Sequence, residues 1–143
     1  MNIKVLRKCI EIAKALCPHN WDDELKSFHA AFIVRKNRIV KIGWNKKKTN
    51  PNSLRHPYIN KSGRKINVYT HAELDAVLKM GRDDLSDYEI VVIRVDGQGK
   101  LNNSKPCHGC AHLLRQVNIK RVFYSTSEQN ISSEMSESKI PLF

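Results

Sequence analysis

Apolar side chains recur along the first third of the chain with two different spacings. In residues 3–17 they lie three to four positions apart, which predicts an amphipathic helix that ends at Pro18. Residues 28–35 and 38–44 are shorter apolar-rich runs typical of strands. Lys36-Asn37 lies between them, and Asn tolerates the left-handed backbone that a tight turn needs. We therefore expect a β-hairpin.

The second half of the chain alternates between helical and strand-like runs. Its predicted elements are helices over residues 71–80 and 107–117 and strands over residues 89–95 and 119–124. Gly81 is a suitable residue to end the first of these helices. Strand–helix–strand alternation favours parallel pairing. The sequence therefore predicts a single α/β domain over residues 1–143, with three α/β/α layers, a mixed sheet that contains the hairpin and parallel strands, and helices on both faces.

The end of the chain, residues 125–143, is a Ser-rich tail with six Ser. Two outcomes fit this composition: a short helix near residues 133–138, or a tail that is partly disordered.

The chain is strongly basic, with 25 Lys and Arg against 14 Asp and Glu and a formal net charge of +11. This balance favours a partner that carries phosphate, either a nucleotide or single-stranded nucleic acid. Seven of the basic residues and no acidic residue fall in the insertion over residues 46–69. The basic insertion is either a solvated face or a phosphate-binding segment. In the second case Arg55 is the best candidate for a bidentate phosphate contact.

Cysteine usage and hydropathy bear on the cellular setting. Four Cys, two of them in one Cys-x-x-Cys pair, do not suggest a disulfide framework. No apolar run approaches the roughly 18 residues of a membrane span, and the N-terminus has no signal-peptide pattern. We expect no membrane partner and a location in a reducing cytoplasm.

Two short motifs carry the candidate chemistry, Thr-His-Ala-Glu ending at Glu73 and Pro-Cys-His-Gly-Cys ending at Cys110. His71, Cys107 and Cys110 supply one imidazole and two thiolates, a ligand set that suits one catalytic zinc ion. Zinc can lower the pKa of a bound water to roughly 7. Glu73 is then expected to carry protons from the water to a ring nitrogen and to the departing amine. The pattern H-x-E followed by P-C-x-x-C is the signature of zinc-dependent nucleobase deaminases.

Helix geometry limits where these residues can meet. Residues two apart in mid-helix point about 200° apart, so His71 and Glu73 converge only where the chain enters a helix. Cys107 and Cys110 are three apart and share one face of a turn, and Pro106 suits a helix start. Both motifs therefore place their ligands at helix N-termini, where the dipole favours thiolate over thiol.

Other interpretations of the Cys-x-x-Cys pair remain open. It can be a redox pair, or half of a closed structural zinc site with His108 or His112 as the fourth ligand. The matched upstream His-x-Glu favours catalytic zinc over both.

The chain resembles the cytidine deaminase-like superfamily, within it the deoxycytidylate deaminase and tRNA adenosine deaminase branch. The resemblance spans about residues 1–124. It rests on four segments: Gly43-Trp44-Asn45, Thr70 to Glu73, Pro106 to Ala111 and Ile119 to Tyr124. It implies the cytidine deaminase-like fold, zinc binding by His71, Cys107 and Cys110, and a proton shuttle at Glu73. It further implies that Asn45 contacts the sugar or base edge of the substrate and that the Ala72 backbone meets the base. Members of this superfamily are commonly oligomers, so a homo-oligomer is expected.

The chain departs from that resemblance at three points. Asp75 stands where deoxycytidylate deaminases often have Asn. The basic insertion has no Cys and only His56, so a second, structural zinc is not expected. Finally, the residues after Tyr124 leave little room for the usual last helix and strand, so the sheet is expected to be short by one strand.

Three functions are compatible with these features. The favoured one is hydrolytic deamination of a cytosine mononucleotide, dCMP or CMP, with the basic insertion on the phosphate. The second is deamination of a polynucleotide, either adenosine in tRNA or cytosine in single-stranded DNA. The third, a non-catalytic zinc-stabilised binding module, gives no role to Glu73.

Overall fold

The computed structural model describes residues 1–47, 58–59, 65–66 and 70–135. Its elements, in chain order, are α1 (Ile3–Asn20), β1 (Phe28–Arg35), β2 (Arg38–Trp44), β3 (Tyr58–Ile59), β4 (Lys65–Ile66), α2 (Ala72–Met80), β5 (Glu89–Val95), β6 (Leu101–Asn102), α3 (His108–Gln116), β7 (Arg121–Ser125) and β8 (Ile131–Met135). None of the helices in these ranges is long and apolar enough to cross a membrane.

The main sheet is mixed and has six strands in the described residues, in the order β2-β1-β5-β7-β8, with β6 also paired to β5. β1 is antiparallel to both β2 and β5, β5 and β7 are parallel, and β8 is antiparallel to β7. The predicted parallel pairing therefore holds across α3. It does not hold across α2, because β1 lies between β2 and β5.

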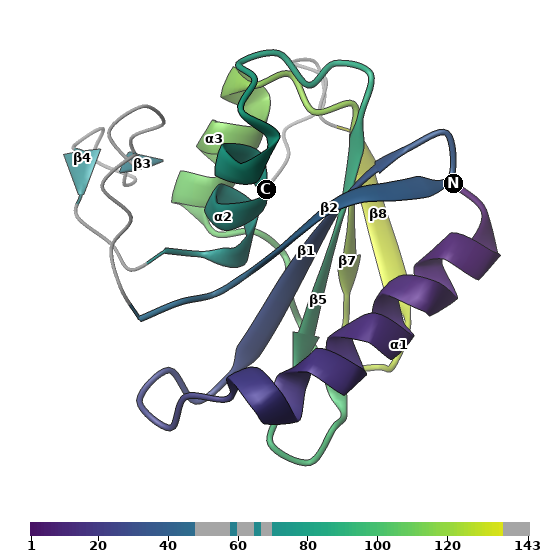
Figure 1. Ribbon diagram of the computed structural model, residues 1–143, viewed down its shortest axis with the longest axis vertical. Coiled ribbons are helices and arrows are strands. Elements are labelled where there is room, and N and C mark those ends of the chain that lie inside the picture. The colour runs from purple at the N-terminus through teal and green to yellow at the C-terminus, as the bar shows by residue number, and fades with distance from the viewer. Residues whose placement is uncertain (48–57, 60–64, 67–69, 136–143) are drawn as a thin grey trace.

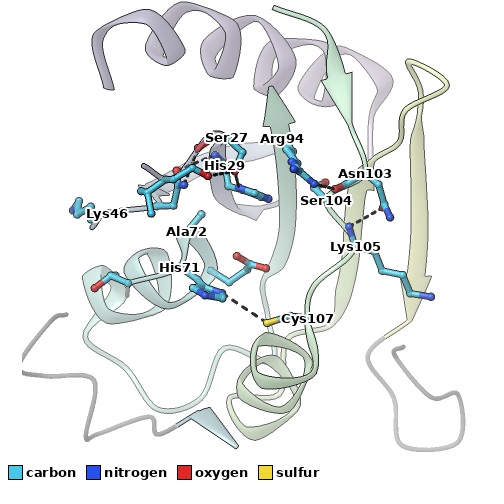
Figure 2. A pocket seen from close by; sticks show the side chains of 14 residues that line it. Ser27, His29, Lys46, His71, Ala72, Arg94, Asn103, Ser104, Lys105 and Cys107 are labelled. Atoms are coloured by element: carbon cyan, nitrogen blue, oxygen red, sulfur yellow. Dashed lines mark hydrogen bonds between the residues drawn. The ribbon is translucent and has the colours of Figure 1, made fainter. Parts of the chain in front are cut away.

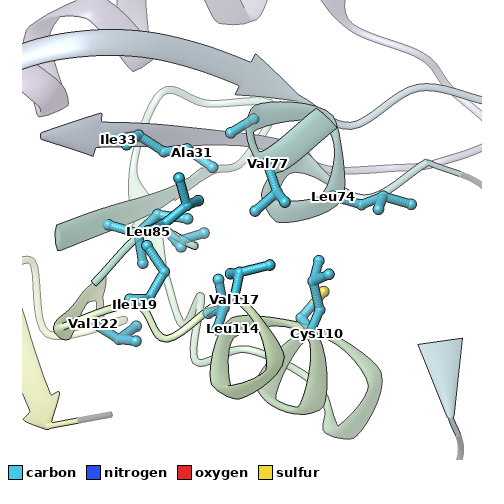
Figure 3. Packing of buried hydrophobic residues seen from close by; sticks show 14 of the residues in the cluster. Ala31, Ile33, Leu74, Val77, Leu85, Cys110, Leu114, Val117, Ile119 and Val122 are labelled. Carbon is cyan, nitrogen blue, oxygen red and sulfur yellow. The ribbon is translucent and has the colours of Figure 1, made fainter. Parts of the chain in front are cut away.

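Helices cover both faces of this sheet (Figure 1), α1 on one and α2 with α3 on the other. Alternation along β1 explains the two cores, since Ile33 packs on the α2 and α3 side and Phe32 on the α1 side. Figure 3 shows the first of these cores, with Leu114 of α3 and Val77 of α2 among its members. The predicted three-layer arrangement is confirmed.

The β1–β2 hairpin has the bounds that the sequence predicts. Arg35 pairs with Arg38 around a two-residue turn. Both turn residues, Lys36 and Asn37, have positive φ values of 48° and 62°. This is the backbone that matches the right-handed twist of a hairpin.

The first helix extends beyond its predicted end. α1 contains Pro18 and continues to Asn20. A proline removes one backbone donor, and near the last turn this interrupts little of the remaining helix. The side-chain amide of Asn20 donates to the Leu16 carbonyl oxygen at 2.9 Å, which satisfies one acceptor of the last turn. Pro18 as the end of the helix was thus a wrong prediction.

The tail also differs from expectation. Residues 131–135 form β8, so a helix starting at 133 is wrong, and residues 136–143 lie outside the described residues. The sheet is not short of a strand either. An antiparallel neighbour can be reached through a short turn, here residues 126–130, whereas a parallel strand needs a crossover of about a dozen residues. The short strand β6 was not predicted, because two residues show no periodicity.

Close packing of α2 on β2 sets the position of the next motif. A Cβ at Gly43 would lie 2.4 Å from the Ala76 nitrogen and 2.7 Å from the Ala72 carbonyl oxygen. Only glycine permits this approach. Because Ala72 is the first residue of α2, the contact at Gly43 fixes the helix start that carries His71 and Glu73.

Candidate active site

Three candidate metal ligands converge where α2 and α3 begin. His71 and Cys107 are the capping residues of the two helices, and Cys110 lies in the first turn of α3. Nδ1 of His71 lies 3.4 Å from Sγ of Cys110 and 3.7 Å from Sγ of Cys107. A nitrogen and a sulfur on one tetrahedral zinc, with bonds of about 2.1 and 2.3 Å, are about 3.6 Å apart. The three side chains therefore fit a zinc ion.

The surroundings of Cys107 favour its thiolate. A hydrogen bond with the Cys110 side chain, with further ones from His71 and the Cys110 backbone, lowers the pKa of the Cys107 thiol to about 4. The Cys110 backbone N–H donates to the Cys107 sulfur at 3.5 Å. Metal binding requires thiolate, and the start of α3 provides donors for it. Neither His108 nor His112 joins the ligand cluster among the described residues, so the closed structural site gains no support.

Glu73 lies beside this cluster in the first turn of α2 and is only 4% exposed. Burial raises the pKa of its carboxyl above the ordinary value, although the charge of His71 opposes the shift. A raised pKa suits a carboxyl that must accept a proton and then return it. Its position and environment are those of a general acid and base.

His71, Cys107 and Glu73 line a cavity of about 420 Å³. This lies within the range of small-molecule sites, about 300–1,000 Å³. In Figure 2, His71 and Cys107 lie below, and Ser27, His29 and Lys46 are separated from Arg94, Asn103, Ser104 and Lys105. The described lining has three basic residues, Lys46, Arg94 and Lys105, against one acidic residue, Glu73. The cavity therefore suits a ligand with negative charge.

Two neighbouring strands explain why a cavity forms here. Ala31 of β1 and Val92 of β5 are register partners, and both are buried beneath α2 and α3. The next pair on the same face is His29 with Arg94. Because α2 and α3 begin near this level, they cover the apolar pair, and the polar pair lines the cavity.

Comparison with known protein families decides what this site belongs to. Residues 3–126 match the model of a family described as the cytidine and deoxycytidylate deaminase zinc-binding region. The chain belongs to this family. Its cofactor is accordingly zinc, for which His71, Cys107 and Cys110 form a potential binding site, and its reaction is hydrolytic deamination.

Solved structures of such deaminases share the fold. The dCMP deaminase of cyanophage S-TIM5, in complex with dCMP and dUMP, is 20% identical with a TM-score of 0.55, over 87% of this chain and 82% of that one. The cytidine deaminase of Burkholderia pseudomallei is 17% identical with a TM-score of 0.56, over 89% of each chain. No curated protein matches the chain by sequence.

The candidate substrate residues have different outcomes. Asn45 lines the cavity, and its side chain is held by two backbone contacts. Its Oδ1 accepts from the His29 N–H and its Nδ2 donates to the Ser27 carbonyl, both at 3.0 Å. Ala72 also lines the cavity at the start of α2. Arg55 lies outside the described residues.

His29 and Arg94 are among the cavity residues that were not assigned a site role from the sequence. Nδ1 of His29 lies 3.5 Å from the Ser27 hydroxyl, and the residue lines the cavity. Burial, with the nearby charge of Arg94, lowers the pKa of His29 to about 4, so its ring is neutral. Arg94 was missed altogether. Its signal in the sequence is a single charge within the apolar run of residues 90–95.

Asp75, which stands where related deaminases often have Asn, has a clear structural role. It is 3% exposed and accepts from the Trp44 backbone N–H at 3.1 Å. It also forms ion pairs with Lys46 at 2.9 Å and Lys79 at 3.0 Å, and both ammonium groups lie over the Trp44 ring. A carboxylate serves two cations better than an amide would. Asp75 thereby ties the end of β2 to α2.

Proposed function

We propose that the protein deaminates a cytosine mononucleotide, converting dCMP or CMP to dUMP or UMP with release of ammonia. The observation that carries this proposal is one cavity that combines two of the three candidate zinc ligands, a buried proton-transfer group and a lining rich in positive charge. The S-TIM5 enzyme, a dCMP deaminase of the same fold, supports the same substrate class.

The reaction adds water to C4 of the cytosine ring and breaks the bond from C4 to the exocyclic nitrogen. His71, Cys107 and Cys110 would hold the zinc ion, which would lower the pKa of water and so provide a nucleophile near neutral pH. The carboxylate of Glu73 takes a proton from the attacking water and gives it to N3 of the ring. Glu73 then takes the remaining proton from the new hydroxyl on C4 and gives it to the exocyclic nitrogen, which leaves as ammonia as the C4 carbonyl forms. Its burial excludes bulk water from these transfers.

Two further residues orient the substrate in this proposal. The side chain of Asn45 is fixed by the backbone of β1 and the residue just before it, and its second amide hydrogen donates to the sugar or base edge. Ala72 is the first helical residue of α2, where backbone N–H groups have no partner within the helix, and it contacts the base.

A direct test is ammonia release by zinc-loaded protein. The substrates are dCMP, CMP, deoxycytidine, and short single-stranded DNA and RNA, each at low and moderate salt. We expect turnover of a mononucleotide in clear preference to its nucleoside, with modest salt dependence.

Two outcomes would contradict the proposal. Turnover of strands alone, falling steeply with salt, would identify a polynucleotide deaminase. Failure to release ammonia from any cytosine compound would place the substrate among other bases. Glu73→Gln, assayed in parallel, controls for contaminating deaminases.

We further propose a cytoplasmic location, because all four cysteines are free thiols and two are needed as metal ligands. The expected homo-oligomer stays a prediction, which light scattering of the purified protein would test.

A further inference from the structure

Arg94 carries a positive charge that the described residues leave without a carboxylate partner. Its Nε is buried and has no hydrogen-bond partner among the described residues. One terminal nitrogen, Nη1, donates to the Asn103 carbonyl oxygen at 3.4 Å, a long contact. A guanidinium is always protonated, and a half-buried charge of this kind is stabilised by an anion.

The other basic residues of the cavity are less suited to binding an anion. Lys46 is paired with Asp75 and also lies over the Trp44 ring. Lys105 is exposed and has an interaction of its own. Arg94 also offers a planar fork of donors that matches two oxygens of one phosphate, which an ammonium group cannot do.

The backbone around Arg94 is rigidly held. Its N–H donates to the Ser125 hydroxyl at 2.9 Å, and that hydroxyl donates to the Asn102 carbonyl at 2.8 Å. The buried Ser104 hydroxyl contacts Ser125 at 2.9 Å and donates to the Val92 carbonyl at 2.6 Å. β5, β7 and the segment leading to Cys107 are thus joined at Arg94. These bonds fix the backbone from which the Arg94 side chain extends, so the backbone need not be ordered when the guanidinium binds a ligand.

Arg94 is also placed away from the reacting group. Figure 2 shows it separated from His71 and Cys107, with the cavity lined by all three. When the base of a substrate lies at the zinc ligands, the other end of the substrate lies against the part of the cavity that Arg94 lines. In a nucleotide, that end is the phosphate.

We propose that Arg94 binds the phosphate of the substrate and thereby makes the enzyme prefer a nucleotide to a nucleoside. This rests on the proposed function and names the residue that selects its substrate. Arg94 acts on binding and leaves the proton transfers to Glu73.

Kinetics with matched substrates test the proposal. In Arg94→Gln, we expect kcat/KM for the mononucleotide to fall about 10- to 100-fold, as for a lost charged hydrogen bond, while kcat/KM for the nucleoside stays within about threefold. Arg94→Lys keeps the charge but loses the planar pair of donors, so its kcat/KM for the mononucleotide should lie between those of the wild type and Arg94→Gln. Arg115→Gln removes the same charge from the exposed end of α3, outside the cavity, and should change neither value. Equal losses on nucleotide and nucleoside in Arg94→Gln would overturn the proposal.

Binding of inorganic phosphate gives a readout that does not depend on turnover. Phosphate should raise the melting temperature of the zinc-loaded wild type and of Arg115→Gln, and should have little effect on Arg94→Gln. An equal shift in all three proteins, or none in the wild type, would show that Arg94 does not bind phosphate. If phosphate binding depends on Arg94 but no mononucleotide is turned over, the proposed function fails and the phosphate site stands.

The phosphate can come from a free nucleotide or from a strand. A cytosine trinucleotide assayed beside the mononucleotide separates these sources. If kcat/KM is higher for the mononucleotide than for the trinucleotide, and this difference disappears in Arg94→Gln, the site binds the phosphate of free nucleotides. If kcat/KM is higher for the trinucleotide and this difference disappears in Arg94→Gln, Arg94 still binds phosphate, but the phosphate belongs to a strand and not to a mononucleotide.

Discussion

The cavity has two walls of different construction. The helix wall, formed by His71, Glu73 and Cys107, comes from the beginnings of α2 and α3. The strand wall, formed by His29 and Arg94, comes from paired positions on β1 and β5. Groups on the helix wall are placed by the first turns of α2 and α3, and a metal ion bound by His71 and Cys107 joins the two helices. Groups on the strand wall are placed by the register of the sheet.

This difference separates chemistry from recognition. Reacting groups must hold their geometry within a fraction of an ångström, which short-range helix geometry and a metal provide. A group that recognises the far end of a substrate can come from any strand position that continues into the cavity. The fold can therefore change its substrate at the strand wall without altering the helix wall.

Among changes near the helix wall, we expect loss of a metal ligand to have the largest effect on zinc binding and activity. In Cys110→Ala, bound zinc should fall from one ion per chain to almost none, with activity below detection, because two ligands hold zinc poorly. Metal analysis and ammonia release would measure this. Cys9→Ala is the matched control, since Cys9 is buried against the opposite face of the sheet. Full zinc occupancy in Cys110→Ala would show that the ligand set is wrong.

Glu73→Gln tests the chemistry of the same wall with its structure retained. We expect kcat to fall about 100- to 10,000-fold, as for loss of a general acid and base, with zinc content and melting temperature nearly unchanged. An amide of the same shape cannot carry the proton. Activity near the wild-type level would remove Glu73 from the mechanism.

Gly43→Ala should disturb the helix wall from outside the cavity. The added methyl would clash with the backbone of α2 and cost about 2–3 kcal/mol of unfolding free energy, and activity should fall as the start of α2 shifts. Urea unfolding measures the first effect. At Gly97, a Cβ would make an ordinary 3.6 Å contact with Trp21, so Gly97→Ala should be nearly neutral. Equal stability of the two variants would contradict the close packing of α2 on β2.

Ser104→Ala should have the smallest effect and should act on the strand wall. It removes the buried hydroxyl that contacts Val92 and Ser125, at a cost of about 1–2 kcal/mol. Because the Arg94 backbone N–H donates to the Ser125 hydroxyl that Ser104 contacts, KM for the nucleotide should rise more than kcat falls. Ser86→Ala, on an exposed loop, is the control. A change in kcat alone would link Ser104 to the helix wall instead.

Local sequence features predicted the parts of the fold that local forces determine. The bounds of β1, β2 and β5 follow from apolar runs and turn residues such as Asn37. The convergence of Cys107 and Cys110 follows from their spacing within one helical turn, and His71 follows from its motif with Glu73. The end of α1 was missed because the last turn tolerates Pro18. β8 was missed because its Ser-rich sequence is weakly apolar, and its pairing with β7 determines its conformation. Arg94 was missed because only sheet register shows that it faces the same space as His29.

The position of the ligands at two helix starts has a further consequence, for folding. His71 and Cys107 are 36 residues apart in the chain, and the segment between them contains all of α2 and β5. An ion bound by both acts as a cross-link that closes this loop. By the chain-entropy relation for cross-links, closing a loop of this length is worth about 4 kcal/mol relative to the open unfolded chain. The cofactor of this enzyme would then also act as a structural cross-link, and a chelator that removes it would lower the free energy of unfolding as well as stop catalysis.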